Sequence, residues 1–139
     1  MMARVRIAFA ALLVAVALSA PVSAEPERIA LGEVSVSEQA PNIDAATVKT
    51  LSEREIRSVD ARRVKRRVVV SVAVVRSTDD PVAVRINATL REAKSGNMIA
   101  VIEGRASSDA LADADLRRAV LRAAVRSAVR QIPEALSGS

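Results

Sequence analysis

The chain has 139 residues, of which 21 are basic and 16 acidic, and it contains neither histidine nor cysteine. It therefore lacks the commonest general base, a thiolate nucleophile, most transition-metal ligands and any disulfide. Aromatic residues make up 1% of the chain. This argues against nucleic acid as a partner, because such proteins stack aromatic side chains on bases.

The first 24 residues have the three-part pattern of a secretory signal. Arg4 and Arg6 form a positive start, the apolar run Ile7–Leu18 follows, and small residues end at Ala24. The apolar run is shorter than the ~20 residues of a transmembrane helix. We therefore expect cleavage after Ala24, a single mature domain over 25–139 without a membrane span, and a periplasmic or secreted location. An uncleaved N-terminal anchor is the alternative.

After this signal, hydrophobic residues recur at every second position, as in a strand, in four segments. In two further segments they recur every three to four positions, as on one face of a helix. The predicted strands are 29–37, 67–77, 82–92 and 98–107. The first predicted helix spans 43–60. The second is capped by Ser108 or Asp109 and stopped by Pro133. The ends 25–28 and 134–139 are expected to be loose.

The element order β-α-β-β-β-α predicts an α+β fold, a two-layer sandwich with a mostly antiparallel four-stranded sheet and two helices on one face. The clean alternation over 82–92 is typical of a half-buried antiparallel strand. The outward face of the sheet is polar enough for water. It is expected to carry Arg85, Asn87, Thr89, Arg91, Glu103 and Arg105.

No pattern of residues points to catalysis. The chain has four glycines, too few for a glycine-rich phosphate loop. Asp79 and Asp80 precede a proline, which is ordinary turn chemistry. Asp109, Asp113 and Asp115 fall at the start of the last helix, where the helix dipole favours carboxylates. We therefore predict a protein that is not an enzyme and that uses no cofactor and no metal.

Two groups of basic residues and the open face of the sheet are the candidate binding surfaces. Four arginines at intervals of four lie on one line of the last helix without acidic neighbours, and their guanidinium forks suit carboxylates or phosphates. The alternative is that they only keep an exposed helix soluble. The other group is a solvated connection between helix and strand, or a contact to an anionic envelope component. The four arginines on the helix are Arg118, Arg122, Arg126 and Arg130. The basic residues of the connection are Arg62, Arg63, Lys65, Arg66 and Arg67.

Several segments together resemble the core of bacterial envelope accessory proteins. They are the helix end EREIRSVD, the strand VVVSVAVVRS, the hairpin INATLREAKSGNMIAVIEGRAS and the C-terminal helix rich in Ala, Val and Arg. The similar families are penicillin-binding-protein activators, curli-secretion-type lipoproteins and transporter auxiliary lipoproteins. The resemblance covers 45–132 and implies an adaptor that binds other proteins. The chain lacks the lipid-bearing cysteine of those lipoproteins.

Taken together, these features predict an exported, non-enzymatic envelope protein that binds a protein or an anionic envelope partner in an accessory role. One alternative is a carrier or sensor of a small ligand held between the sheet and the helices, where small Ala and Val side chains leave room. Another is a homodimeric structural module that self-associates through an exposed sheet edge or face.

If the signal is removed as predicted, the exported protein begins with Glu25. We expect its intact mass, measured on protein recovered outside the cytoplasm, to correspond to residues 25–139. A mass that includes residues 1–24 would show instead that the segment is retained as an anchor.

Overall fold

The computed structural model describes residues 28–137, so the predicted signal and the first residues of the predicted mature chain lie outside the described part. The elements follow in the predicted order, with two short helices added. They are β1 (Ile29–Val36), α2 (Ala45–Arg57), the 3-10 helix η1 (Ala61–Arg63), β2 (Val68–Asp79), β3 (Val82–Glu92), β4 (Met98–Ser108), α3 (Ala114–Val129) and α4 (Ile132–Ser137).

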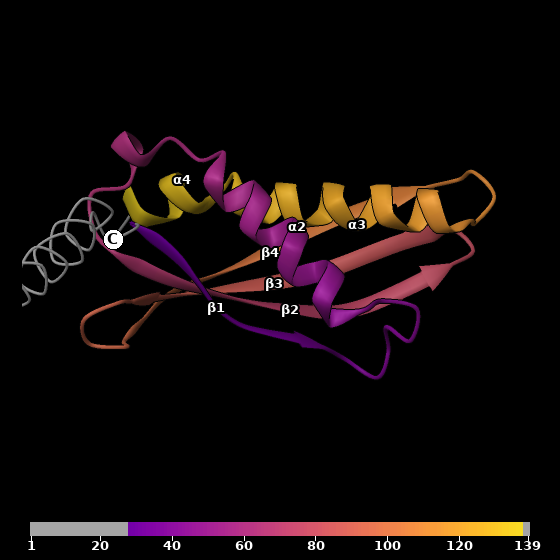
Figure 1. The fold of residues 1–139 in the computed structure, drawn as a ribbon, viewed down its shortest axis with the longest axis horizontal. Helices are drawn as coiled ribbons and strands as arrows, with labels where there is room; N and C mark the ends of the chain where they lie inside the picture. Colours follow the sequence, from indigo (N-terminus) through magenta and orange to yellow (C-terminus); the bar gives the residue numbers. More distant parts are fainter. Residues whose placement is uncertain (1–27, 138–139) are drawn as a thin grey trace, which may run out of the picture.

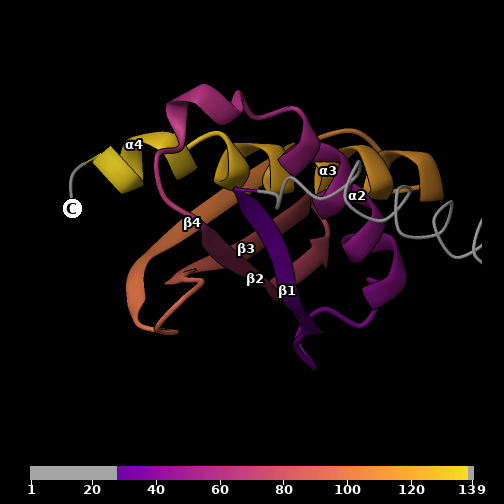
Figure 2. The ribbon, with the colours of Figure 1, turned by 60° about the vertical axis from the view of Figure 1, so that its left-hand side comes forward.

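The four strands form one sheet in the order β1-β2-β3-β4. The pair β1–β2 is parallel, and the pairs β2–β3 and β3–β4 are antiparallel. The helices lie on one face of this sheet and leave the other face uncovered (Figures 1 and 2). The predicted α+β class, with a mostly antiparallel sheet under one layer of helices, is therefore confirmed.

The core lies between the sheet and the helices. As the alternation predicts, the valines at even positions of β2 and the apolar residues at even positions of β3 point into it, and burial of their side chains drives this packing. The largest fully buried side chains are Val48, Leu51, Val64, Val68, Val70, Val72, Val74, Val82, Ile86, Leu90, Val125 and Ile132.

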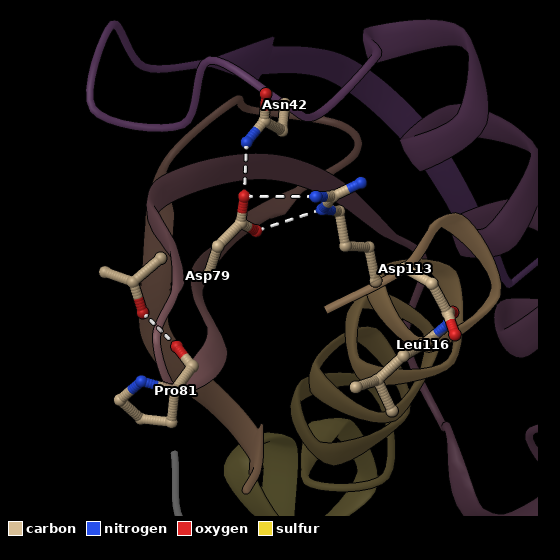
Figure 3. A network of polar contacts seen from close by, with 7 residues as sticks. Asn42, Asp79, Pro81, Asp113 and Leu116 are labelled. Atoms are coloured by element: carbon tan, nitrogen blue, oxygen red, sulfur yellow. Dashed lines mark hydrogen bonds and ion pairs between the residues drawn. The ribbon is translucent and has the colours of Figure 1, made fainter. Parts of the chain in front are cut away.

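Both ends of the last helical region differ from the prediction. The helix begins at Ala114 with Asp113 as its cap, not after Ser108 or Asp109, and the Asp113 carboxylate accepts a hydrogen bond from the Leu116 N–H at 2.7 Å (Figure 3). The later start has a physical reason, because Ser108 is still part of β4, where it pairs with Val82.

The expected loose tail over 134–139 is wrong as far as Ser137. α4 occupies Ile132–Ser137, and its Ile132 and Leu136 side chains are buried in the core. Pro133 ends the regular run of α3 as predicted, but it also lies in the first turn of α4, where a missing N–H costs no hydrogen bond. Tertiary packing therefore holds a segment whose own length is too short for a stable helix.

Asp79 connects three parts of the fold at the end of β2. Its carboxylate pairs with Arg117 of α3, with N–O distances of 3.0 and 3.2 Å, and accepts a hydrogen bond from Asn42 at 2.9 Å (Figure 3). The sequence indicates a turn residue, and the structure adds this ion pair. Because both charged side chains are about one-third exposed, the pair positions α3 more than it stabilises the protein.

α3 approaches β4 most closely at Gly104. A Cβ atom at this position would lie 2.3 Å from the carbonyl oxygen of Ala124 and 2.9 Å from the Cβ of Ala128. Only a glycine facing two alanines permits this spacing. The contact therefore fixes both the height of α3 above the sheet and its rotation.

We expect Gly104→Ala to lower the free energy of unfolding by about 1–3 kcal/mol, the usual cost of overpacking. Denaturant unfolding measures this change. Gly96→Asn is the control, because a Cβ added at Gly96 would have no neighbouring atom within 4 Å. Gly96 has a φ of 75°, which asparagine tolerates. The free energy of unfolding of this variant should stay within about 0.5 kcal/mol of the unchanged protein. An unchanged midpoint for Gly104→Ala would contradict the close contact.

Candidate functional site

Three of the four arginines predicted on the last helix line a groove between α2 and α3. We call it the basic groove. Its volume is about 400 Å³, and its lining residues are Leu51, Arg54, Asp115, Arg118, Ala119, Arg122, Ala123 and Arg126. Arg130 is the C-cap of α3 and does not line the groove. The helical spacing therefore brings Arg118, Arg122 and Arg126 together, and α2 adds Arg54.

A buried carboxylate lies under this groove. The Glu55 side chain is 7% exposed, and its oxygens accept from Nε and Nη2 of Arg126 at 3.3–3.4 Å. The Nε of Arg122 lies 3.5 Å from the same carboxylate. The prediction that the arginine line has no acidic neighbours is therefore wrong, because the neighbour comes from the other helix.

The sequence does contain a signal for Glu55 that the prediction missed. The buried residues of α2 are Val48, Leu51, Ser52, Glu55 and Ile56. Their spacing is that of one helix face, so a glutamate occurs in the middle of the apolar stripe. A buried carboxylate requires a partner with the opposite charge, and the arginines of α3 are the only basic line that the topology places against α2 in the described chain.

The basic groove has more positive than negative charge. Arg122 and Arg126 share the single charge of Glu55, and Asp115 is the other acidic residue at the groove. Arg54 and Arg118 are exposed and form no hydrogen bond or ion pair with the residues that the structure describes. Glu55 also restricts the rotamers of two guanidiniums, which reduces the entropy lost when they bind a ligand.

The second predicted group lies on the connection from η1 into β2, as expected. Arg62, Arg63, Lys65 and Arg67 are exposed and Arg66 is half-buried. Hydrogen bonds from the backbone and side chain of Arg62 hold the pKa of Asp60 below its usual value. Arg66 lies 3.7 Å from Glu92. Of the five, Arg66 and Arg67 line a common hollow, of about 500 Å³, together with Glu92, Ala93 and Lys94.

A third basic surface lies on the uncovered sheet face. Arg76 of β2 is directly opposite Arg85 of β3, and Arg85 is directly opposite Arg105 of β4. We call these three residues the arginine row. Arg105 pairs with Glu103, and this hydrogen bond, with a contribution from the charge of Arg85, lowers the pKa of Glu103.

The sequence places Arg85 and Arg105 on this face but misses Arg76. Strict alternation from Val74 would direct Arg76 into the core. The register of β2 shifts between Val74 and Arg76, and this irregularity turns Arg76 outward to solvent. Sequence alternation alone does not locate such a bulge.

A cleft between β1 and α2 is the place where a small ligand would fit. Its volume is about 460 Å³, and its lining mixes apolar and charged residues, namely Arg28, Ile29, Ala30, Leu31, Glu53, Ile56, Arg57, Val59 and Ala61. It lies at the β1 edge of the sheet, where the sheet layer meets the helix layer. The ligand-carrier alternative stays a prediction, with this cleft as its candidate site.

Within residues 28–137, no group of three or more acidic side chains is placed to hold a metal ion. In the same range, no helix is both long and apolar enough to cross a membrane.

The fold occurs in solved structures of low sequence identity. The hypothetical protein CT253 from Chlamydia trachomatis is 13% identical, with a TM-score of 0.58 over 80% of this chain and 98% of that one. PelC from Paraburkholderia phytofirmans, solved as a dodecamer, is 14% identical, with a TM-score of 0.51 over 73% of this chain and 86% of that one. No family model matches the sequence, and no curated protein matches it. These likenesses show the fold alone.

We expect Glu55→Gln to destabilise the protein, because it leaves Arg122 and Arg126 without their counter-ion. The free energy of unfolding should fall by about 1–3 kcal/mol. Glu53→Gln is the control. Glu53 is on the same helix, is half-buried and has no ion pair among the described residues, so its effect should stay within about 0.5 kcal/mol. Equal effects of the two changes would show that the Glu55 pairs do not hold α2 against α3.

Proposed function

We propose that the protein is an exported, non-enzymatic accessory domain of the bacterial cell envelope that binds an acidic protein partner in the basic groove. The observation that supports this most directly is the arrangement around Glu55. One buried carboxylate orients Arg122 and Arg126, while Arg54 and Arg118 beside them remain exposed without a counter-ion in the described chain.

The chemistry of the groove favours carboxylates on a partner protein. Guanidinium groups bind carboxylates through two parallel hydrogen bonds, which are stronger than bonds between neutral groups. The groove runs between two helices and includes the small residues Ala119 and Ala123, so an acidic segment can lie close to the backbone. Exposed arginines also increase the rate of encounter with an acidic surface.

Several carboxylates have structural partners, which supports a binding role over catalysis. Asp79 pairs with Arg117, Asp113 caps α3, and Glu55 pairs with two arginines. None of them adjoins a histidine or cysteine, since the chain contains neither. The predicted export signal at the N-terminus and the resemblance to envelope accessory proteins support the proposed location.

Self-association is a second candidate function, and the edge strand β4 favours it. β4 has 11 residues, and one side of it is not paired with another strand of the sheet. Met98 and Val101 on β4 are 56% and 55% exposed. A long edge with exposed apolar residues is a template for pairing with a second chain. PelC, which has a similar fold, was solved as a dodecamer.

We expect the groove to be the contact surface in cells. A photo-cross-linking amino acid at Ala123 should capture a partner, and Arg54→Glu with Arg118→Glu should reduce that capture at least ~10-fold. Both arginines are exposed, so the fold should persist, as circular dichroism would check.

Lys49→Glu with Lys94→Glu is the control, since it makes the same change of charge at exposed positions outside the groove and outside both basic groups. Capture that both double variants reduce equally would overturn the groove as a specific site. Capture of a second copy alone would replace the proposal with self-association.

A further inference from the structure

The arginine row is a concentration of charge that folding does not explain. Arg76, Arg85 and Arg105 are neighbours on three adjacent strands, which are ~4.8 Å apart in a sheet. Like charges directly opposite each other destabilise a sheet. Arg76 and Arg85 are exposed and have no hydrogen bond or ion pair within the described residues. The charge of Glu103, which is hydrogen-bonded to Arg105, also acts on Arg85, so one carboxylate offsets only part of the repulsion among three arginines.

A hollow lies next to the arginine row. The next cross-strand line consists of Thr78, Ala83 and Ser107, whose side chains are much shorter than arginine. The hollow has a volume of about 400 Å³ and is lined by Arg76, Thr78, Ala83, Val84, Arg85, Arg105, Ala106 and Ser107. Three guanidiniums therefore border a space whose floor is an alanine and whose ends carry hydroxyl groups.

The bulge in β2 is a separate observation that points to the same place. The register shift between Val74 and Arg76 is the only reason that Arg76 faces the hollow and not the core. Bulges of this kind redirect side chains and occur often beside functional sites. At this bulge, the redirected side chain adds a third positive charge to the row.

We propose that the arginine row binds the phosphate group of a phosphomonoester. Glu103 neutralises one of the three arginines, which leaves two positive charges. A phosphomonoester carries ~1.5–2 negative charges at pH 7 and has three acceptor oxygens. Its charge and its oxygens therefore match the row, whereas a carboxylate has one charge and two oxygens. This site is on the sheet face opposite the helices and does not depend on the basic groove.

The test is calorimetric titration of the purified full chain with inorganic phosphate at pH 7.5, with the ionic strength held constant by chloride. We expect saturable binding that Arg76→Gln and Arg85→Gln each weaken at least ~10-fold. Arg91→Gln is the matched control, because Arg91 is exposed on the same sheet face but lies outside the row. Its affinity for phosphate should be unchanged.

A second arm distinguishes a soluble ligand from a lipid. Vesicles with phosphatidic acid present a phosphomonoester, and vesicles with phosphatidylglycerol present a phosphodiester with less charge. Binding only to phosphatidic acid vesicles, with the same dependence on Arg76 and Arg85, would support the site with a lipid headgroup as its ligand. Absence of binding in both arms, equal binding to both vesicle types, or equal loss in Arg91→Gln would each overturn the proposal.

Discussion

The close contact between α3 and β4 at Gly104 is the constraint on which the other features depend. Because Gly104 has no Cβ and faces Ala124 and Ala128, α3 lies low on the sheet with one rotation about its axis. That rotation turns Arg122 and Arg126 toward α2, where Glu55 accepts hydrogen bonds from Arg126 and forms an ion pair with Arg122. The same placement brings Arg117 to Asp79 at the other end of the helix. A larger residue at Gly104 would shift all of these pairs together.

The fold separates two basic surfaces with one apolar core. The groove on the helix side is built around a buried carboxylate, so Arg122 and Arg126 are held in place before any partner binds. The arginine row on the sheet side has no buried carboxylate beneath it. Strand register aligns the row, and the exposed Glu103 pairs with Arg105 alone. The first arrangement suits an extended acidic surface, because its charges are distributed along two helices. The second suits a compact anion, because three arginines, one of them neutralised by Glu103, line one hollow.

Local structure followed closely from residue patterns. The alternation over 82–92 predicts β3 with its observed bounds, because a strand with one buried face must repeat every two residues. The start of α3 could not be read in this way. Asp109 and Asp113 are both good caps, and the choice between them depends on how far β4 pairs with β3. α4 was missed because its stability comes from the burial of Ile132 and Leu136 and not from its own sequence.

The sequence alone placed Arg118, Arg122, Arg126 and Arg130 on one line of a helix, because helical periodicity is a property of neighbouring residues. It also placed Arg85 and Arg105 on the outer sheet face. The tertiary structure decided which of these arginines are paired and which are free to bind. Glu55 is 71 residues from Arg126, and Arg76 reaches the sheet face only through a bulge. Contacts of this kind depend on the packing of distant segments, which no local repeat encodes.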